Sequence, residues 1–278
     1  MAMTTPTSAE AWRPNVISTF DPDDMLKEAL IVTASSRAGS VEGDAPSVLV
    51  PYVSTDPTAG FVPEGDLIPL ADPGASQIAI TTDKVAVVTR VSRELTTEPG
   101  AAERIANSLR RSVTRKADVA FMANVSDPTG LLAVAGVATA GDLGGATDPN
   151  LFAVYDAVAA IEDDGGEATH VLINPLDWAE LCKLPEATGS NKSLLADVHN
   201  AAARSLGGVP VIVHSAVTEG TALVIDKTEI VSAYGQLQLA RSDDAFFQHD
   251  AVAIRATWRI GWNVVRPARL QKLTIGAA

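Results

Sequence analysis

The sequence predicts a mixed α+β protein with a long projecting arm, and three observations lead to that fold class. Residues 96–124 repeat apolar side chains at close to helical spacing, which predicts one long amphipathic helix. Residues 251–265 alternate apolar and polar side chains, which predicts one very long strand. Residues 54–76 are rich in proline and glycine, which predicts a loop without a core of its own. Since such a loop must be buried by a neighbour, we expect an assembly protein.

Composition limits the classes of protein to which the chain can belong. It has 278 residues, 46% of them hydrophobic, so it can bury a substantial core. The net charge of −13 argues against a protein whose main task is to grip phosphates. No apolar run reaches the roughly 18 residues of a membrane helix, and residues 1–12 do not resemble a secretory signal. We therefore expect no membrane partner and, with Cys182 as the single cysteine, a reducing compartment.

The first 92 residues predict an arm followed by a hairpin. Residues 1–46 are mostly small and polar, with a short helix expected to start at Asp21-Pro22-Asp23-Asp24 and to include Ala29 and Leu30. Residues 47–53 and 77–92 are rich in β-branched side chains and predict two strands. The proline- and glycine-rich loop lies between them, so we expect an extended, projecting hairpin.

The predicted long helix begins at Thr96, which would cap it ahead of Pro99, and ends near Asn124. At about 1.5 Å per residue it would span about 38 Å. One apolar stripe runs along it: Ile105, Leu109, Val113, Ala117 and Phe121.

The middle of the chain predicts a compact α/β unit. A helix over 151–163 should end at Gly165-Gly166, and a strand over 169–173 should follow. Asn174 should cap a short helix that has Pro175 at its first position. Further strands are expected at 211–213 and 221–225, before the strand-rich last third.

Catalytic motifs are absent from the sequence. It contains no Walker-type phosphate loop, no dinucleotide fingerprint and no Gly-x-Ser-x-Gly elbow, and its four histidines do not stand at metal-ligand spacing. We therefore expect no enzyme activity, no cofactor and no metal. A soluble α/β enzyme using His249, Asp250 or Cys182 is the alternative from a different class. For Cys182 a buried structural role is favoured over a nucleophile.

Basic side chains concentrate on the long helix of this acidic chain. They are Arg104, Arg110, Arg111, Arg115 and Lys116. A solvated helix face is one interpretation, and a surface for neighbouring subunits or for the chain's own arm is the other. The arm's acids, which could dock there, are Asp21, Asp23, Asp24 and Glu28. Contact with nucleic acid is a third interpretation, which the net charge disfavours.

Several segments, in this order, resemble the major capsid proteins of tailed bacteriophages with the Hong Kong 97-type shell fold. Residues 61–65 resemble the family's aromatic-x-x-Glu-Gly signature, and residues 84–95 resemble its return strand, which ends in Val-Ser-x-Glu-Leu. Residues 118–132 resemble the end of its spine helix and the turn beyond. Residues 173–175 and 206–211 resemble its axial domain, and residues 250–267 its closing strand, with the paired Arg255 and Arg259.

The resemblance implies a division of the chain and a set of subunit contacts. The divisions would be an N-terminal arm (1–46), an extended loop with its base strands (47–92), a peripheral domain with the spine helix (93–140), an axial domain (141–227), long peripheral strands (228–266) and a C-terminal strand returning to the axial domain (267–278). The expected contact residues between subunits are Phe61, Glu64, Asp66, Arg90, Arg93, Glu94, Arg110, Arg111, Arg115, Arg255 and Arg259.

The resemblance also implies a function. Pentamers and hexamers of the chain would close an icosahedral virion shell around double-stranded DNA, assembled in the host bacterial cytoplasm. The inner face would meet this DNA without sequence-specific binding. Residues 54–83 contain no lysine, so the Lys–Asn crosslink of some relatives is not expected, and non-covalent contacts of the extended loop and the N-terminal arm would hold the shell. Since only about 46 residues precede the first strand, we expect a separate scaffolding protein, besides a portal and an optional decoration protein. An encapsulin-type nanocompartment shell is the alternative within the same fold.

Overall fold

The first sheet is built around one long strand, β11 (Ala251–Val264). The computed structural model describes residues 29–39, 47–98, 100–144, 150–184, 195 and 204–276. Within them the sheet has the order β1-β9-β11-β3-β2, and β10 also pairs with β11. The other strands are β1 (Ser36–Gly39), β2 (Ser47–Thr55), β3 (Gly74–Ser92), β9 (Ile230–Tyr234) and β10 (Gln238–Phe246). The predicted β11 and hairpin strands are confirmed, and β2 and β3 extend further into the loop than predicted.

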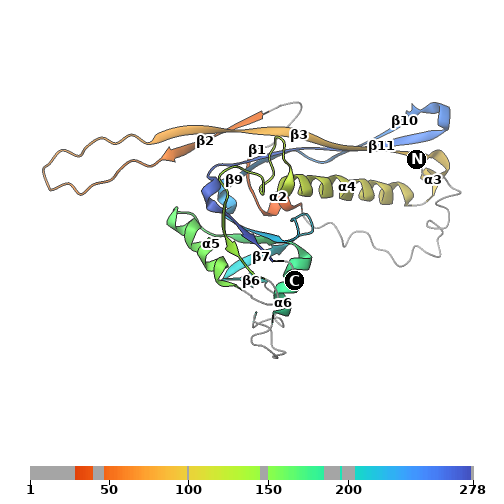
Figure 1. Ribbon diagram of the computed structural model, residues 1–278. Coiled ribbons are helices and arrows are strands. Elements are labelled where there is room, and N and C mark those ends of the chain that lie inside the picture. Colours follow the sequence, from red (N-terminus) through yellow and green to blue (C-terminus); the bar gives the residue numbers. More distant parts are fainter. Residues whose placement is uncertain are drawn as a thin grey trace.

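The strand β3 changes partner halfway along its 19 residues. Its second half pairs with β11, from Ser92 opposite Ala251 to Thr82 opposite Gly261. Its first half pairs with β2, from Thr81 opposite Ser47 onward. Only glycine fits at position 261, because a Cβ there would lie 2.3 Å from the Thr81 carbonyl oxygen. The β2–β3 hairpin therefore continues beyond the end of β11 and projects from the body (Figure 1).

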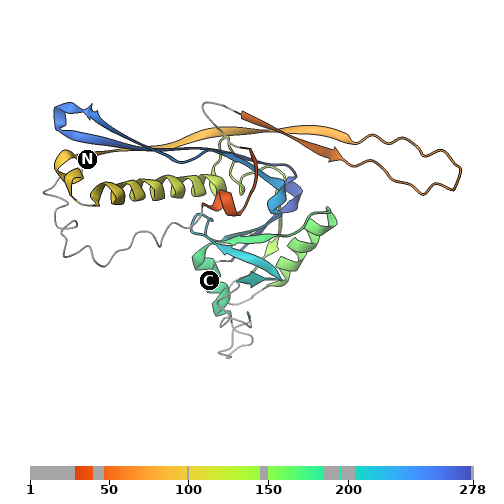
Figure 2. The same ribbon diagram turned by 180° about the vertical axis from the view of Figure 1, so that it is seen from behind.

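The helix α4 (Ala101–Ala123) packs along one face of this sheet. Its 23 residues span about 35 Å at the usual rise of about 1.5 Å per residue. The five predicted stripe residues are all buried, which confirms the apolar face. The Phe121 ring meets the edge of Trp262 of β11 with the ring centroids 5.3 Å apart. Figures 1 and 2 show α4 lying alongside β11 from both sides.

The start of the long helix differs from the prediction. Ser92, not Thr96, is the capping residue, and it caps a separate short helix, α3 (Arg93–Thr97), by accepting from the Leu95 N–H. Glu98 is extended (ψ 133°), as expected for a residue before proline. Gly100, with φ 75°, then precedes α4. Two helices, α3 and α4, therefore stand where we had predicted a single helix from Thr96.

The second sheet has the order β4-β12-β8-β5-β7-β6. Helix α5 (Phe152–Asp163) covers one face, and α6 (Pro175–Lys183) follows β5, with the Asn174 side chain accepting from the Leu176 N–H as predicted. Gly165 follows α5 at φ 74°, in agreement with the predicted stop. The strands are β4 (Ala138–Asp142), β5 (His170–Ile173), β6 (Ser205–Leu206), β7 (Val209–Val213), β8 (Thr221–Ile225) and β12 (Leu270–Thr274).

The side chains of β8 point alternately into two hydrophobic cores, and this strand connects the packing of the two sheets. Ala222 and Val224 pack under α5, whereas Leu223 and Ile225 enter the core shared with α4 and β11. Successive side chains of a strand point to opposite faces, so the second sheet is buried on both sides. The second sheet and its helices lie on the α4 side of the first sheet (Figure 1).

The segment before the hairpin is more ordered than predicted. Residues 34–43 belong to the predicted arm of mostly small and polar residues, for which no strand was predicted, but Ser36–Gly39 form β1, parallel to β9. The Ser35 and Ser232 hydroxyls, 2.7 Å apart, hold this contact. The helix predicted from Asp21 lies outside the described residues except at its end. There Ala29 is not helical, and the helix α2 comprises Leu30–Thr33.

Candidate intersubunit surface

The tip of the hairpin is almost entirely exposed. Between β2 and β3, residues 56–73 take part in no sheet, and each is exposed except the half-buried Val62. One local hydrogen bond shapes the segment, donated by the Asp66 N–H to the Pro63 carbonyl at 3.2 Å. The fully exposed Phe61 and the exposed Glu64 and Asp66 lie here. The structure therefore places these three predicted contact residues together, away from the core.

Three further apolar side chains accompany Phe61 on the tip, and sequence reasoning missed them. Leu67, Ile68 and Leu70 are exposed by 92%, 75% and 100%. Contiguous exposed apolar side chains mark interaction sites, since a soluble subunit rarely leaves them in water. The sequence did carry a signal for them, because apolar residues are frequent in a segment whose prolines and glycines predict a loop outside the core.

An ionic cluster holds the root of the hairpin. Arg266 donates from Nη2 to the Val53 carbonyl of β2 at 2.8 Å and from Nη1 to Glu229 Oε1 at 2.9 Å. Arg269 donates to the same Glu229 oxygen at 2.6 Å and to Asp164 at the end of α5 at 2.9 Å. Burial disfavours the charged form of Arg269, but its bonds to Asp164 and Glu229 outweigh this and raise the pKa of the guanidinium.

This cluster connects the hairpin to the second sheet. Glu229 is buried, and Arg266 lies over the Tyr52 ring, 6.0 Å from its centroid. Removing Glu229 would leave two cations without their shared partner, which is costly in a partly buried site. The hairpin root and the end of α5 are therefore held in a fixed relation.

The predicted strand residues lie on the face of β3 and β11 that is turned away from α4. Cross-strand register puts Arg90 opposite Ala253, Arg255 opposite Val88 and Arg259 opposite Lys84, all on one face. Arg255 is exposed. The Arg90 guanidinium lies 5.7 Å from the Phe246 ring centroid, and Arg259 Nε donates to Thr82 Oγ1 at 3.0 Å. This face therefore carries a basic row.

Arg93 and Glu94 are exposed on α3, at the end of β3. Arg93 pairs with Asp250 at 2.8 Å. This pair joins α3 to the turn before β11, at the end of the molecule opposite the hairpin tip (Figure 2).

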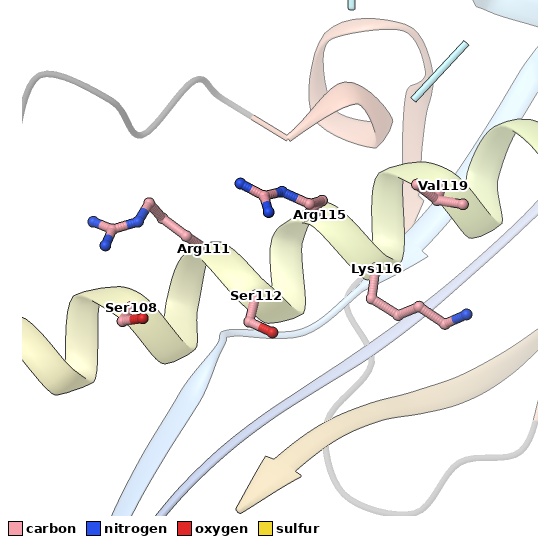
Figure 3. Close-up of a pocket in the computed structure, with 6 residues that line it drawn as sticks. All are labelled: Ser108, Arg111, Ser112, Arg115, Lys116 and Val119. Atoms are coloured by element: carbon pink, nitrogen blue, oxygen red, sulfur yellow. The ribbon is translucent and has the colours of Figure 1, made fainter. Parts of the chain in front are cut away.

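The helix arginines form another surface. A hollow of about 500 Å³ lies along α4, lined by Ser108, Arg111, Ser112, Arg115, Lys116 and Val119. Figure 3 shows Arg111 and Arg115 pointing to one side of the helix and Lys116 to the other. Arg110 lies apart and donates to Asn107 Oδ1 at 3.4 Å. The predicted contact residues therefore fall on separate surfaces: the tip, the β3–β11 face with α3, and α4.

The residues of the enzyme alternative do not form a site. The Asp250 carboxylate pairs with Arg93, and its side chain is 76% exposed. Cys182 lies on α6, far from the β10–β11 turn that carries His249 (Figure 1). Burial raises the pKa of the Cys182 thiol, although Arg204 opposes this, and a raised pKa is unfavourable for a nucleophile.

Over the described ranges, no three His, Cys, Asp or Glu residues gather closely enough to hold a metal ion. The helices of the described residues are all too short or too polar to cross a membrane.

Comparisons with known proteins agree with this architecture. Residues 24–275 match a family described as the phage capsid family. A chain from Mycobacterium phage Adephagia has the same fold, with a TM-score of 0.74 at 14% identity, covering 100% of this chain and 99% of that one. The capsid of an empty GTA particle has a TM-score of 0.72 at 20% identity, covering 99% of this chain and 98% of that one. A chain from Gordonia phage Cozz has a TM-score of 0.71 at 19% identity, covering 100% of this chain and 96% of that one. No curated protein sequence matches this chain.

Proposed function

Because this chain belongs to the phage capsid family, and is thus a structural protein of a virion shell, we propose that its copies assemble as pentamers and hexamers into an icosahedral shell around double-stranded DNA. The single observation that carries this proposal is the projecting hairpin. Its tip exposes Phe61, Leu67, Ile68 and Leu70, which nothing in the described part of the subunit covers. Closed shells repeat one interface many times, so a neighbouring copy is the natural partner.

The proposed fold is the Hong Kong 97-type, divided as the resemblance implies. In support, α4 and the long strands β3 and β11 form one layered unit, and α5, α6 and the second sheet form another. The pairing of β12 with β8 supports a C-terminal segment that returns to the axial domain. Residues 1–28 and 40–46 of the proposed arm lie outside the described residues.

The proposed contacts fall into two groups by chemistry. Phe61 and its apolar neighbours on the tip would be buried against an adjacent subunit, with Glu64 and Asp66 at the rim. The basic row of Arg90, Arg255 and Arg259 would meet carboxylates of another copy, and Arg93 and Glu94 would lie beside it. Ion pairs that become buried between subunits select the partner's orientation more than they add affinity.

The remaining partners are proposed on the same basis. A scaffolding protein supplied as a separate chain, a portal and an optional decoration protein would complete the particle, which assembles in the host cytoplasm. The net charge of −13 supports an inner face that meets the packaged DNA without trapping it. We propose no enzymatic role, since the family is structural.

Truncating the hairpin tests this function. Val53 lies opposite Ala75 in the ladder, so replacing residues 54–74 by Asn-Gly would close it with a tight turn. We expect a folded subunit, with the circular dichroism spectrum and melting cooperativity of the full chain, that forms no shells by electron microscopy. Exposed Val125, outside the hairpin, supplies the control: Val125→Ser should assemble normally. Normal shells from the truncated chain would refute the role of the hairpin.

A further inference from the structure

Basic side chains on one face of α4 are followed, toward the C-terminal end of the helix, by the buried carboxylate of Asp118. Arg104, Arg111 and Asp118 are spaced by seven residues, and seven residues return to within about 20° of the same face of a helix. Arg115 lies three residues before Asp118, on the adjoining part of this face. The three arginines and the carboxylate therefore form one stripe along α4.

The N-terminal part of the chain meets this stripe at its Asp118 end. The Leu30 N–H, at the start of α2, donates to Asp118 Oδ1 at 2.8 Å, and this bond is buried. In Figure 3, Arg111 and Arg115 point to the side of α4 on which α2 lies. Among the described residues, neither arginine has a carboxylate partner. Arg111 and Arg115 thus present positive charge next to the point where the chain reaches α2.

The residues before α2 carry negative charge and lie close enough along the chain to contact these arginines. Residues 21–28 contain four carboxylates and one lysine: Asp21, Asp23, Asp24, Glu28 and Lys27. Measured along the helix axis, Arg115 lies about 4.5 Å and Arg111 about 10.5 Å from Asp118. An extended chain of five residues, the separation of Asp24 from Ala29, spans up to about 17 Å. Both arginines are within range without any change in α2 or α4.

We propose that residues 21–28 of this chain dock on Arg111 and Arg115 of this stripe, in the same subunit. The segment is tethered beside its site, so its effective concentration is about millimolar or higher and exceeds that of a free acidic partner. Exposed ion pairs contribute little singly, so the docking depends on several carboxylates engaging at once, and high salt weakens it. The inference concerns the single subunit and does not depend on how the shell is arranged.

Hydrogen–deuterium exchange of the unassembled, full-length chain tests the docking. In Arg111→Glu/Arg115→Glu, the amides of residues 21–28 should exchange roughly tenfold faster, because a docked segment is protected and a released one is not. Adding Asp23→Lys/Asp24→Lys restores opposite charges and should restore the protection. Arg110→Glu changes the same charge on another face of α4 and should have no effect. Unchanged exchange in the first variant, or no rescue by the second, would overturn the proposal.

A disulfide pair gives a second measurement that does not depend on charge reversal. In a Cys182→Ser background, Asp24→Cys with Arg115→Cys should oxidise within one chain and migrate as a compacted monomer in a denaturing gel without reductant. Asp24→Cys with Arg110→Cys should oxidise far more slowly. Equal rates for the two pairs would show that the segment does not dock on the stripe. Disulfides between two chains would show that it docks on a neighbour instead, and either outcome overturns the proposal.

Discussion

Asp118 is the buried carboxylate on which three parts of the subunit meet. It is 3% exposed, on α4. It accepts from the Leu30 N–H of α2, and its Oδ2 lies 3.5 Å from His214 Nε2, after β7 of the second sheet. His214 Nδ1 accepts from the Ala216 N–H at 3.1 Å, so in the neutral ring the proton is assigned to Nε2, facing Asp118. Burial raises the pKa of Asp118 to about 6, although the Leu30 hydrogen bond opposes the shift.

This raised pKa predicts a stability that depends on pH. The pKa is about 6 in the folded subunit against an ordinary 3.8, so the folded state binds the proton more tightly. The free energy of unfolding should therefore fall by roughly 3 kcal/mol as the pH rises from about 4 to about 6, at about 1.4 kcal/mol per pKa unit. Asp118→Asn cannot titrate and should lose this slope, measured by urea unfolding of the unassembled subunit at pH 4 and pH 7.

The exposed Asp243 provides the matched control for this prediction. It pairs with Arg241 on β10, and its side chain is 52% exposed. Asp243→Asn should keep the slope of the unmodified chain. If Asp118→Asn has the same slope as the unmodified chain, the buried carboxylate is not its source.

The hairpin is the element whose apolar side chains a single subunit leaves most exposed. Residues 54–83 contain no lysine that could form a Lys–Asn bond, so we expect the contacts of this segment to be non-covalent. Assembled shells boiled in detergent and reductant should therefore run as one band at 28.9 kDa. A ladder of multiples of that mass would show covalent links between subunits. Shells whose accessible lysines have been acetylated after assembly supply the control and should give the same band.

Elements with a strong local pattern were predictable from the sequence, and elements fixed by distant partners were not. The stripe of α4, the alternation of β11 and the Asn174 cap are local, and the structure confirms them. The strand β1 depends on pairing with β9, almost two hundred residues later in the chain, and small polar side chains give no sign of it. The predicted helix start at Thr96 was wrong because a short helix, α3, already ends at Thr97 and the long helix, α4, begins only at Ala101.

The candidate site was predictable to a similar degree. Phe61, Glu64 and Asp66 were found because proline and glycine mark the loop in which they lie. The ionic cluster at the hairpin root was missed because Glu229, Arg266 and Asp164 come together only through the pairing of both sheets. Interactions of this kind, between residues distant in sequence, leave no periodic signal.

The whole molecule is elongated, with the hairpin tip at one end and the β10–β11 turn at the other (Figures 1 and 2). Its two sheets share one core through β8, and Arg266 joins the hairpin root to this body. Exposed apolar side chains on a projection anchored in this way are suited to a repeated contact with the next copy. Shell formation is therefore the property that this architecture predicts.

Electron microscopy of the purified full-length chain, with and without a scaffolding protein, tests this property most directly. We predict closed icosahedral shells, or hexamers before closure, in which density for the hairpin of each subunit lies against its neighbour. A monodisperse globular monomer under every condition, or shells in which the hairpin contacts no other subunit, would contradict assembly through the hairpin.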